Sequence, residues 1–137
     1  MAFAIKSAIE KPPAGVLLFP AQKTMYGGRR IAEDDVIFLF ASENSGGRGL
    51  IAKGVVTAAA AVPRKPGVER QTPRVDVTIE VIAPALRPLG RAELKPFDRW
   101  DDGRPETELN FKFYRQATDK IVGLTDGAAA FLGSFFL

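Results

Sequence analysis

The sequence contains no cysteine and no histidine. Without cysteine the chain has no disulfide and no thiolate ligand for a metal, which suits a reducing compartment. Without histidine it lacks the commonest general base and the commonest metal ligand. Ser–His–Asp, Cys–His and histidine-based zinc chemistry are therefore excluded. We expect a binding protein rather than an enzyme, with no cofactor and no metal.

The sequence also lacks long hydrophobic runs. None approaches the about 20 apolar residues that span a bilayer, and the first ten residues include Lys6 and Glu10 and no apolar stretch of signal-peptide length. We therefore expect a cytoplasmic protein with no membrane partner. The 137 residues fit a single domain over 1–137. The net charge of +3 mildly favours an anionic partner.

Apolar patterns predict five or six strands. Val36–Ala41 is a continuous run of β-branched, aromatic and aliphatic residues, which predicts a strand buried on both faces. Val75–Ile82 alternates apolar and polar residues in period two, which predicts a half-buried strand. The predicted strands are Ala2–Ile5, Val16–Phe19, Val36–Ala41, Gly49–Ala58, Val75–Ile82 and Lys120–Leu124.

Polar and proline-rich segments separate these strands. Pro12 and Pro13 predict an interruption after the first strand, and Pro20–Arg30 and Ala59–Pro73 are predicted to be loops. Thr125 is placed to cap a C-terminal helix over Asp126–Phe136, whereas Glu108–Tyr114 fits either a strand or a helix. The fold class is therefore α+β: a small mixed β-barrel of five to six strands with a few short helices, including a C-terminal helix.

Short motifs along the chain resemble the PUA-like superfamily, particularly its EVE and YTH branches. Phe3–Ser7 is similar to a first strand that ends in Lys-Ser beside the pocket. Val36–Ala41, followed by Ser42 and Asn44-Ser45-Gly46, resembles the strand and turn that precede a glycine-containing return strand in both branches. Other matching stretches are Gly15-Val16, the return strand from Gly49 to Val56, Leu94–Phe97, and Phe113–Gln116 through Leu124.

This resemblance implies an EVE-like, PUA-like barrel whose pocket holds a flipped or single-stranded nucleobase of RNA or DNA, including a modified base. The sequence departs from the YTH pattern, in which tryptophans enclose a methylated base. Leu17 stands where a first cage tryptophan is expected, and the only tryptophan of the chain is Trp100. The methyladenine specificity of YTH domains is therefore not carried over.

Polar and aromatic side chains near the matching motifs are the candidate binding residues. Hydroxyl and amide groups read base edges, cations hold phosphates, and an exposed tryptophan stacks on a base. Turn formation and plain solvation are the alternative roles for the serine, asparagine and arginine residues. The pocket candidates are Lys6, Ser7, Ser42, Asn44, Trp100, Arg115 and Gln116, and the rim candidates are Arg29, Arg30 and Arg48. Tyr26 is a further candidate for stacking.

Two other functions fit the sequence. The same barrel could bind a protein or a small metabolite, with the apolar C-terminal helix as a dimer surface; we expect a monomer or a weak homodimer. The acidic residues Asp101, Asp102, Glu106 and Glu108 could support carboxylate-dependent hydrolysis, but a solvated loop is the expected role. Nucleic-acid binding should weaken steeply with salt, whereas an apolar interface should not.

Overall fold

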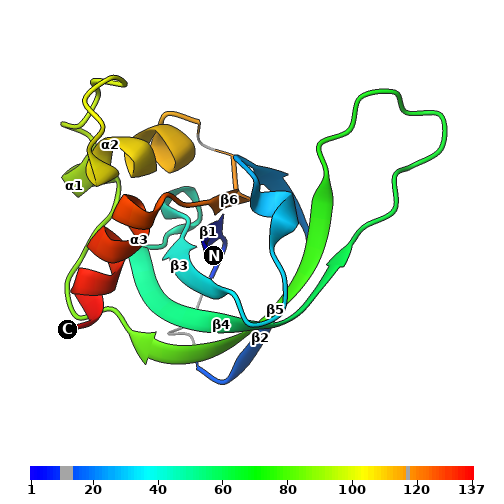
Figure 1. Cartoon of the computed structure of the whole chain (residues 1–137), viewed down its shortest axis with the longest axis horizontal. Coiled ribbons are helices and arrows are strands. Elements are labelled where there is room, and N and C mark those ends of the chain that lie inside the picture. Colours follow the sequence, from blue (N-terminus) through cyan, green and yellow to red (C-terminus); the bar gives the residue numbers. More distant parts are fainter. Residues whose placement is uncertain (10–13, 117) are drawn as a thin grey trace.

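The computed structural model describes residues 1–9, 14–116 and 118–137. Six strands within these ranges close into one barrel in the order β1-β3-β4-β5-β2-β6 (Figure 1), which confirms the predicted fold class. The strands are β1 (Ala2–Ser7), β2 (Val16–Met25), β3 (Val36–Ala41), β4 (Gly49–Ala61), β5 (Arg74–Pro84) and β6 (Lys120–Gly123). The α-helices are α1 (Arg91–Leu94), α2 (Pro105–Leu109) and α3 (Asp126–Gly133).

Short helical turns complete the element order. The 3₁₀ turns are η1 (Gly28–Arg30), η2 (Glu43–Ser45) and η4 (Ser134–Phe136), and η3 (Asn110–Tyr114) is one turn of π-helix. The interruption predicted at Pro12 and Pro13 lies outside the described residues. None of the helices in the described part of the chain is long and apolar enough to cross a membrane.

Parallel pairing closes the barrel. β1 runs parallel to β3, with Ala2 opposite Val36 and Ser7 opposite Ala41. β2 ends parallel to β6, while the remaining neighbours are antiparallel. Because β1 and β3 run in the same direction, both end at one rim, where the Ser42 amide donates to the carbonyl oxygen of Ser7 over 2.8 Å.

Apolar side chains from all six strands fill the barrel interior. β3 is buried almost throughout, as its composition predicts. The interior residues are Phe3, Ile5, Phe19, Ile37, Leu39, Ala52, Val56, Val75, Val77, Ile79 and Ile121. The space between β3 and β4 is therefore occupied by side chains of the described residues.

The helices cover the outer face of β1, β3 and β6. Figure 1 shows α2 and α3 lying on one side of the barrel. Ala128, Leu132 and Phe135 from the C-terminal segment are buried with Phe38 and Phe113. The predicted cap is present, because the Ala128 amide donates to Thr125 Oγ1 over 3.2 Å. Most apolar side chains of α3 and η4 thus belong to the core, which leaves little of them for a dimer surface.

The loop predicted over Pro20–Arg30 differs from the structure. β2 continues through Pro20 to Met25 because a bulge between Phe19 and Gln22 accommodates the proline. Ala21 has φ 50° at this bulge, and its amide donates to Asp76 Oδ1 over 2.7 Å. The first part of the predicted loop, Pro20–Met25, is therefore strand, and the rest is a turn followed by η1.

The 108–114 segment is helical. α2 begins at Pro105, a residue suited to a first helical turn, and continues into the π-helical turn η3. Leu109 and Phe113 are four residues apart and both fully buried, so they lie on one face of the helical segment. The C-terminal helix also ends earlier than predicted, with α3 changing at Ser134 to the 3₁₀ turn η4.

Candidate nucleic-acid interface

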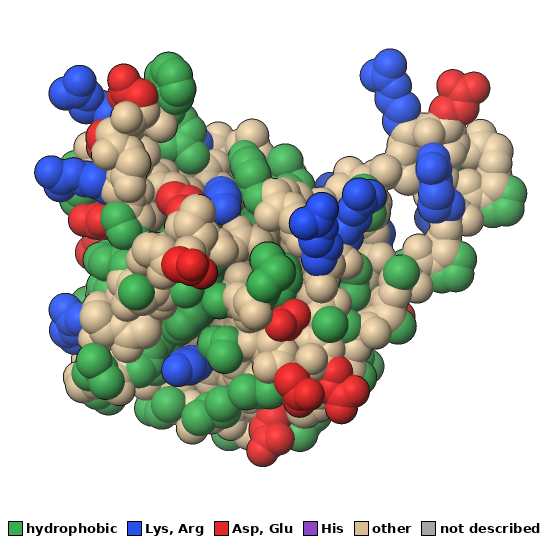
Figure 2. Space-filling view, in the orientation of Figure 1, with side chains coloured by type: hydrophobic (Ala, Val, Ile, Leu, Met, Phe, Trp, Pro, Cys, Tyr) green, Lys and Arg blue, Asp and Glu red, His purple; other side chains and the backbone are tan. Residues whose placement is uncertain are grey.

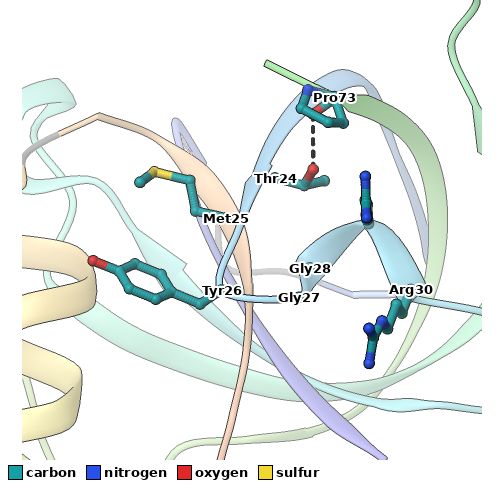
Figure 3. Close-up of a pocket in the computed structure, with 8 residues that line it drawn as sticks. Thr24, Met25, Tyr26, Gly27, Gly28, Arg30 and Pro73 are labelled. Atoms are coloured by element: carbon teal, nitrogen blue, oxygen red, sulfur yellow. Dashed lines mark hydrogen bonds between the residues drawn. The ribbon is translucent and has the colours of Figure 1, made fainter.

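A surface pocket lies where β2 ends and turns into η1. It has a volume of about 340 Å³ and is lined by Thr24, Met25, Tyr26, Gly27, Gly28, Arg29, Arg30 and Pro73. Figure 3 shows Met25 and Tyr26 on one side of the Gly27–Gly28 turn and Arg30 on the other. Thr24 joins the pocket to the start of β5, because its amide and its hydroxyl both donate to the carbonyl oxygen of Pro73.

The backbone at Tyr26, Gly27 and Gly28 fixes the shape of this pocket. Tyr26 has φ 53° and Gly27 has φ 82°, both in the left-handed region that glycine adopts without strain. Gly28 packs directly on β6, since a Cβ at this position would lie 2.2 Å from the carbonyl oxygen of Ile121. β6 therefore forms the support on which the pocket is built.

The side chains around the pocket combine positive charge with an exposed ring. Arg29 and Arg30 are exposed, and no described residue forms a hydrogen bond or an ion pair with either guanidinium group. Tyr26 is 46% exposed, and the Lys112 ammonium lies 5.2 Å from its ring centroid. Lys112 is held there by Glu108 and by the carbonyl oxygen of Gly123. The pocket can therefore hold phosphate oxygens beside a stacked heterocycle.

A second polar cluster lies at the opposite end of β6. Lys6 and Lys120 are direct cross-strand partners, and their side chains are 1% and 0% exposed. Lys6 Nζ donates to the carbonyl oxygen of Phe113 over 2.7 Å, which ties η3 to the barrel. Lys120 Nζ donates to the carbonyl oxygens of Gln116 and Thr118 over 2.7 and 3.0 Å. Two adjacent buried lysines give this end of the barrel a concentrated positive charge.

Burial dominates the protonation of both lysines. It lowers the pKa of Lys6, and the nearby Asp119 carboxylate opposes this effect. Burial, followed by repulsion from Lys6, lowers the pKa of Lys120 to about 8, again against Asp119. The Lys120 ammonium forms no ion pair with a carboxylate of the described residues. An anion near this cluster would favour the charged form of both groups.

The pKa of Lys120 predicts how stability changes with pH. An unfolded lysine has a pKa of about 10.4, so between about pH 8 and 10 the unfolded chain binds more protons at this position. The free energy of unfolding contributed by Lys120 should therefore rise with pH across that interval and be constant below it. The lowered pKa of Lys6 acts in the same direction.

Urea unfolding at pH 7.5, 8.5 and 9.5 measures this dependence. Lys120→Met should reduce the rise in stability with pH, whereas Lys95→Met, at an exposed position, should retain it. An identical pH dependence in the wild type and in Lys120→Met would contradict the assignment.

Glu43, Asn44 and Arg91 connect the β3–β4 turn to α1. The Arg91 amide donates to Glu43 Oε2, and its guanidinium donates to Asn44 Oδ1, both over 2.9 Å. Glu43 Oε1 and Tyr114 Oη are buried without a hydrogen-bond partner in the described part of the chain. Burial and the Glu43 carboxylate raise the pKa of Tyr114 well above its usual value, so it stays a neutral phenol. Asn44 here fixes the turn to α1, the structural role that its residue type also suggested.

The structure brings some predicted site residues together and separates others. Lys6, Ser7 and Ser42 lie at the common rim of β1 and β3, and Gln116 reaches the same region through its carbonyl bond to Lys120. The predicted grouping of Arg48 with Arg29 and Arg30 is wrong. Arg48 lies against Gly90 at the start of α1, because the β3–β4 turn folds onto that helix.

Trp100 lies in a third region. Its side chain is 80% exposed and borders a cavity of about 470 Å³ with Arg104, Glu108, Phe111 and Thr125, among others. The Arg115 guanidinium lies 5.2 Å from the ring centroid of Phe111, on the border of the same cavity. Arg115 is thus linked to this cavity only through Phe111, and no described hydrogen bond or ring contact joins Trp100 or Arg115 to Ser42 or Asn44.

The acidic residues of the same region have structural partners. Asp102 accepts hydrogen bonds from the Arg104 amide and from Thr107 Oγ1, and these bonds lower its pKa. Glu108 binds Lys112 and Thr125. These contacts cap α2 and join it to α3, which gives the two carboxylates a structural role.

Three residues of the polar regions were not predicted: Lys112, Arg91 and Lys120. Lys120 carried a signal, because it begins an otherwise apolar strand, where a lysine is unusual. Lys112 and Arg91 carried none, because their positions depend on how α1 and α2 pack on the barrel.

Comparison with known proteins identifies the fold. No protein-family model and no curated protein sequence matches the chain. The solved structure of the DUF55 domain of human thymocyte nuclear protein 1 matches with a TM-score of 0.66 and 16% identity, covering 98% of this chain and 97% of that one. Human THYN1 in complex with 5-methylcytosine-containing DNA matches with a TM-score of 0.64 and 14% identity, covering 97% and 95%.

A bacterial structure matches over the full length of both chains. It is a Pseudomonas putida protein, with a TM-score of 0.64 and 14% identity. The chain therefore has the PUA-like, EVE-type fold of the DUF55 domain, as the sequence resemblance predicted. At these identities the likeness concerns the fold.

Proposed function

We propose that this chain is a nucleic-acid-binding module that holds a flipped or single-stranded base, including a modified one such as 5-methylcytosine, and catalyses no reaction. The observation that carries the proposal is the pocket beside Tyr26, which is lined by two exposed guanidinium groups and by a half-exposed aromatic ring. Guanidinium groups bind phosphate in a forked geometry, and an aromatic ring accepts any base on its face.

The size and position of the pocket support this assignment. A volume of about 340 Å³ lies within the range of about 300–1,000 Å³ that ligand clefts occupy. The buried Lys120 lies on β6, the strand that supports the pocket, and Lys6 pairs with it from β1. Both lysines add positive potential that attracts an anionic ligand. The fold match to human THYN1, whose structure contains 5-methylcytosine DNA, supports a modified base as the ligand to test first.

The alternative of an apolar protein interface has less support. Its proposed surface, the C-terminal helix, contributes Ala128, Leu132 and Phe135 to the core. The described surface beside Tyr26 is instead charged, which favours a polyanion.

A ring substitution tests which aromatic residue stacks on the base. Tyr26→Ala should weaken binding to a fluorescent DNA carrying one 5-methylcytosine by about 1–3 kcal/mol, because it removes the stacking surface but no charge. Tyr26→Phe keeps the ring and should bind as the wild type does. Fluorescence anisotropy measures the affinity of the wild type and of both variants for this DNA. The unmethylated oligonucleotide and a single-stranded RNA of the same length serve as comparison ligands.

The outcomes separate the competing assignments. Trp100→Ala should leave the affinity unchanged; a loss in this variant and none in Tyr26→Ala would move the site to the Trp100 cavity. Wild-type binding that does not weaken as salt rises, or no binding to any of the oligonucleotides, would overturn nucleic-acid recognition.

A further inference from the structure

The β4–β5 connection and the first residue of β5 project from the barrel as an arm, which we define as residues 62–74. Figure 1 shows it extending beyond the barrel on the side away from α3. β4 and β5 stay paired up to Ala61 and Val75, and the Val62 amide donates to the carbonyl oxygen of Arg74 over 2.9 Å. Beyond this bond almost every residue is exposed. The arm therefore contributes little to the hydrophobic core, and packing does not explain its length.

The arm carries the entire charge excess of the chain. Four of the 19 Lys and Arg residues and one of the 16 Asp and Glu residues lie in it, so its net charge is +3 and that of the remaining sequence is zero. No ion pair within the described ranges joins its cations to Glu69. The cations are Arg64, Lys65, Arg70 and Arg74.

Specific hydrogen bonds hold the arm in shape. The Gln71 amide group donates to the carbonyl oxygens of Lys65 and Val68 and accepts from the Lys65 amide, at 2.8–2.9 Å. The Arg64 guanidinium donates to the carbonyl oxygen of Glu69 over 2.9 Å. Prolines at 63, 66 and 73 restrict the backbone further. A loop that is only solvated needs no such hydrogen bonds. A binding surface benefits from them, because a preorganised surface loses less entropy when it binds.

The arm and the pocket beside Tyr26 border the same region. Pro73, at the base of the arm, lines the pocket and is bonded to Thr24. Figure 2 shows Lys and Arg side chains over η1 and along the arm, with a hollow between the arm and the body of the molecule. A duplex has two rows of phosphates and can therefore meet both cationic surfaces, whereas a single strand has one.

We infer that the arm binds the phosphate backbone of double-stranded nucleic acid next to the base held at the barrel, an inference that rests on the proposed function. Lys65 and Arg70 supply exposed charges whose side chains form no hydrogen bond or ion pair with described residues. Each phosphate that a cation neutralises releases a counterion, so the arm makes the affinity strongly salt-dependent.

The test is a salt titration of duplex binding by the double variant Lys65→Gln/Arg70→Gln. Loss of two phosphate contacts should lower the slope of log K against log salt by roughly two units and weaken binding at least about tenfold near 0.1 M salt. The control Lys95→Gln/Arg99→Gln removes the same charge at exposed positions outside the arm and should behave as the wild type does. For a single strand of the same sequence, Lys65→Gln/Arg70→Gln should lose less affinity than it loses for the duplex.

The result distinguishes this inference from the proposed function. An unchanged slope in the arm variant, with normal wild-type binding, overturns the role of the arm and leaves base recognition in place. An equal loss of affinity in the arm and control variants would mean that net charge alone causes the effect, and this result also overturns the role of the arm. Absence of wild-type binding to duplex and single strand overturns the proposed function and the arm inference together.

Discussion

Reversing the charge of both η1 arginines, in Arg29→Glu/Arg30→Glu, should weaken DNA binding by at least about 100-fold near 0.1 M salt. The variant removes two phosphate contacts and adds two repulsive carboxylates at the pocket. Neither guanidinium forms a hydrogen bond or an ion pair with a described residue, so the fold should be retained and the free energy of unfolding should change by less than about 0.5 kcal/mol. Anisotropy and urea unfolding measure the two quantities on the same preparation.

The matched control for this variant is Lys95→Glu/Arg99→Glu. It makes the same change in net charge at exposed positions near α1 and the Trp100 region. If both variants lose affinity equally, long-range charge and not the pocket controls binding. If the control loses more, the nucleic acid binds on the Trp100 side of the molecule and the pocket beside Tyr26 is not the site.

Replacing Gly28 with Ala should destabilise the protein by about 3 kcal/mol and lower its melting temperature by roughly 10 °C. The added Cβ would lie 2.2 Å from the carbonyl oxygen of Ile121 and 2.8 Å from its carbonyl carbon, which are backbone atoms that cannot rotate away. η1 would have to move off β6, and with it Arg29 and Arg30. Gly28→Ala should therefore weaken DNA binding even at temperatures where the variant is folded.

Gly133 provides the matched control, a glycine at which an added Cβ meets no neighbouring atom. It lies in α3 with φ −56°, and a Cβ there would meet nothing within 4 Å. Gly133→Ala should stabilise the protein by about 0.5–1 kcal/mol and leave DNA binding unchanged. Calorimetry compares the melting temperatures of Gly28→Ala and Gly133→Ala. Equal melting temperatures would mean that the contact between η1 and β6 does not constrain the pocket.

The positions of β3, β5 and the capped C-terminal helix follow from local patterns. An apolar run at Val36–Ala41 and a period-two alternation at Val75–Ile82 each specify a strand, because burial on one or both faces selects for that spacing. Other boundaries depend on distant partners. Pro20 ends a strand by local rules, yet β2 continues because a bulge opposite β5 absorbs the proline. Segment 108–114 is helical because Leu109 and Phe113 face the core beside β1 and β6.

The candidate interface divides in the same way. The sequence alone determined the cationic excess of the arm, the absence of histidine and cysteine chemistry, and the residue types that suit a base and its phosphates. Only the tertiary structure decided that Lys6 and Lys120 are buried side by side, that Arg48 is held at α1, and that Tyr26, Arg29 and Arg30 share a pocket. The physical reason is that the β1–β6 and β2–β6 pairings join residues far apart in the chain, and no local pattern records such pairings.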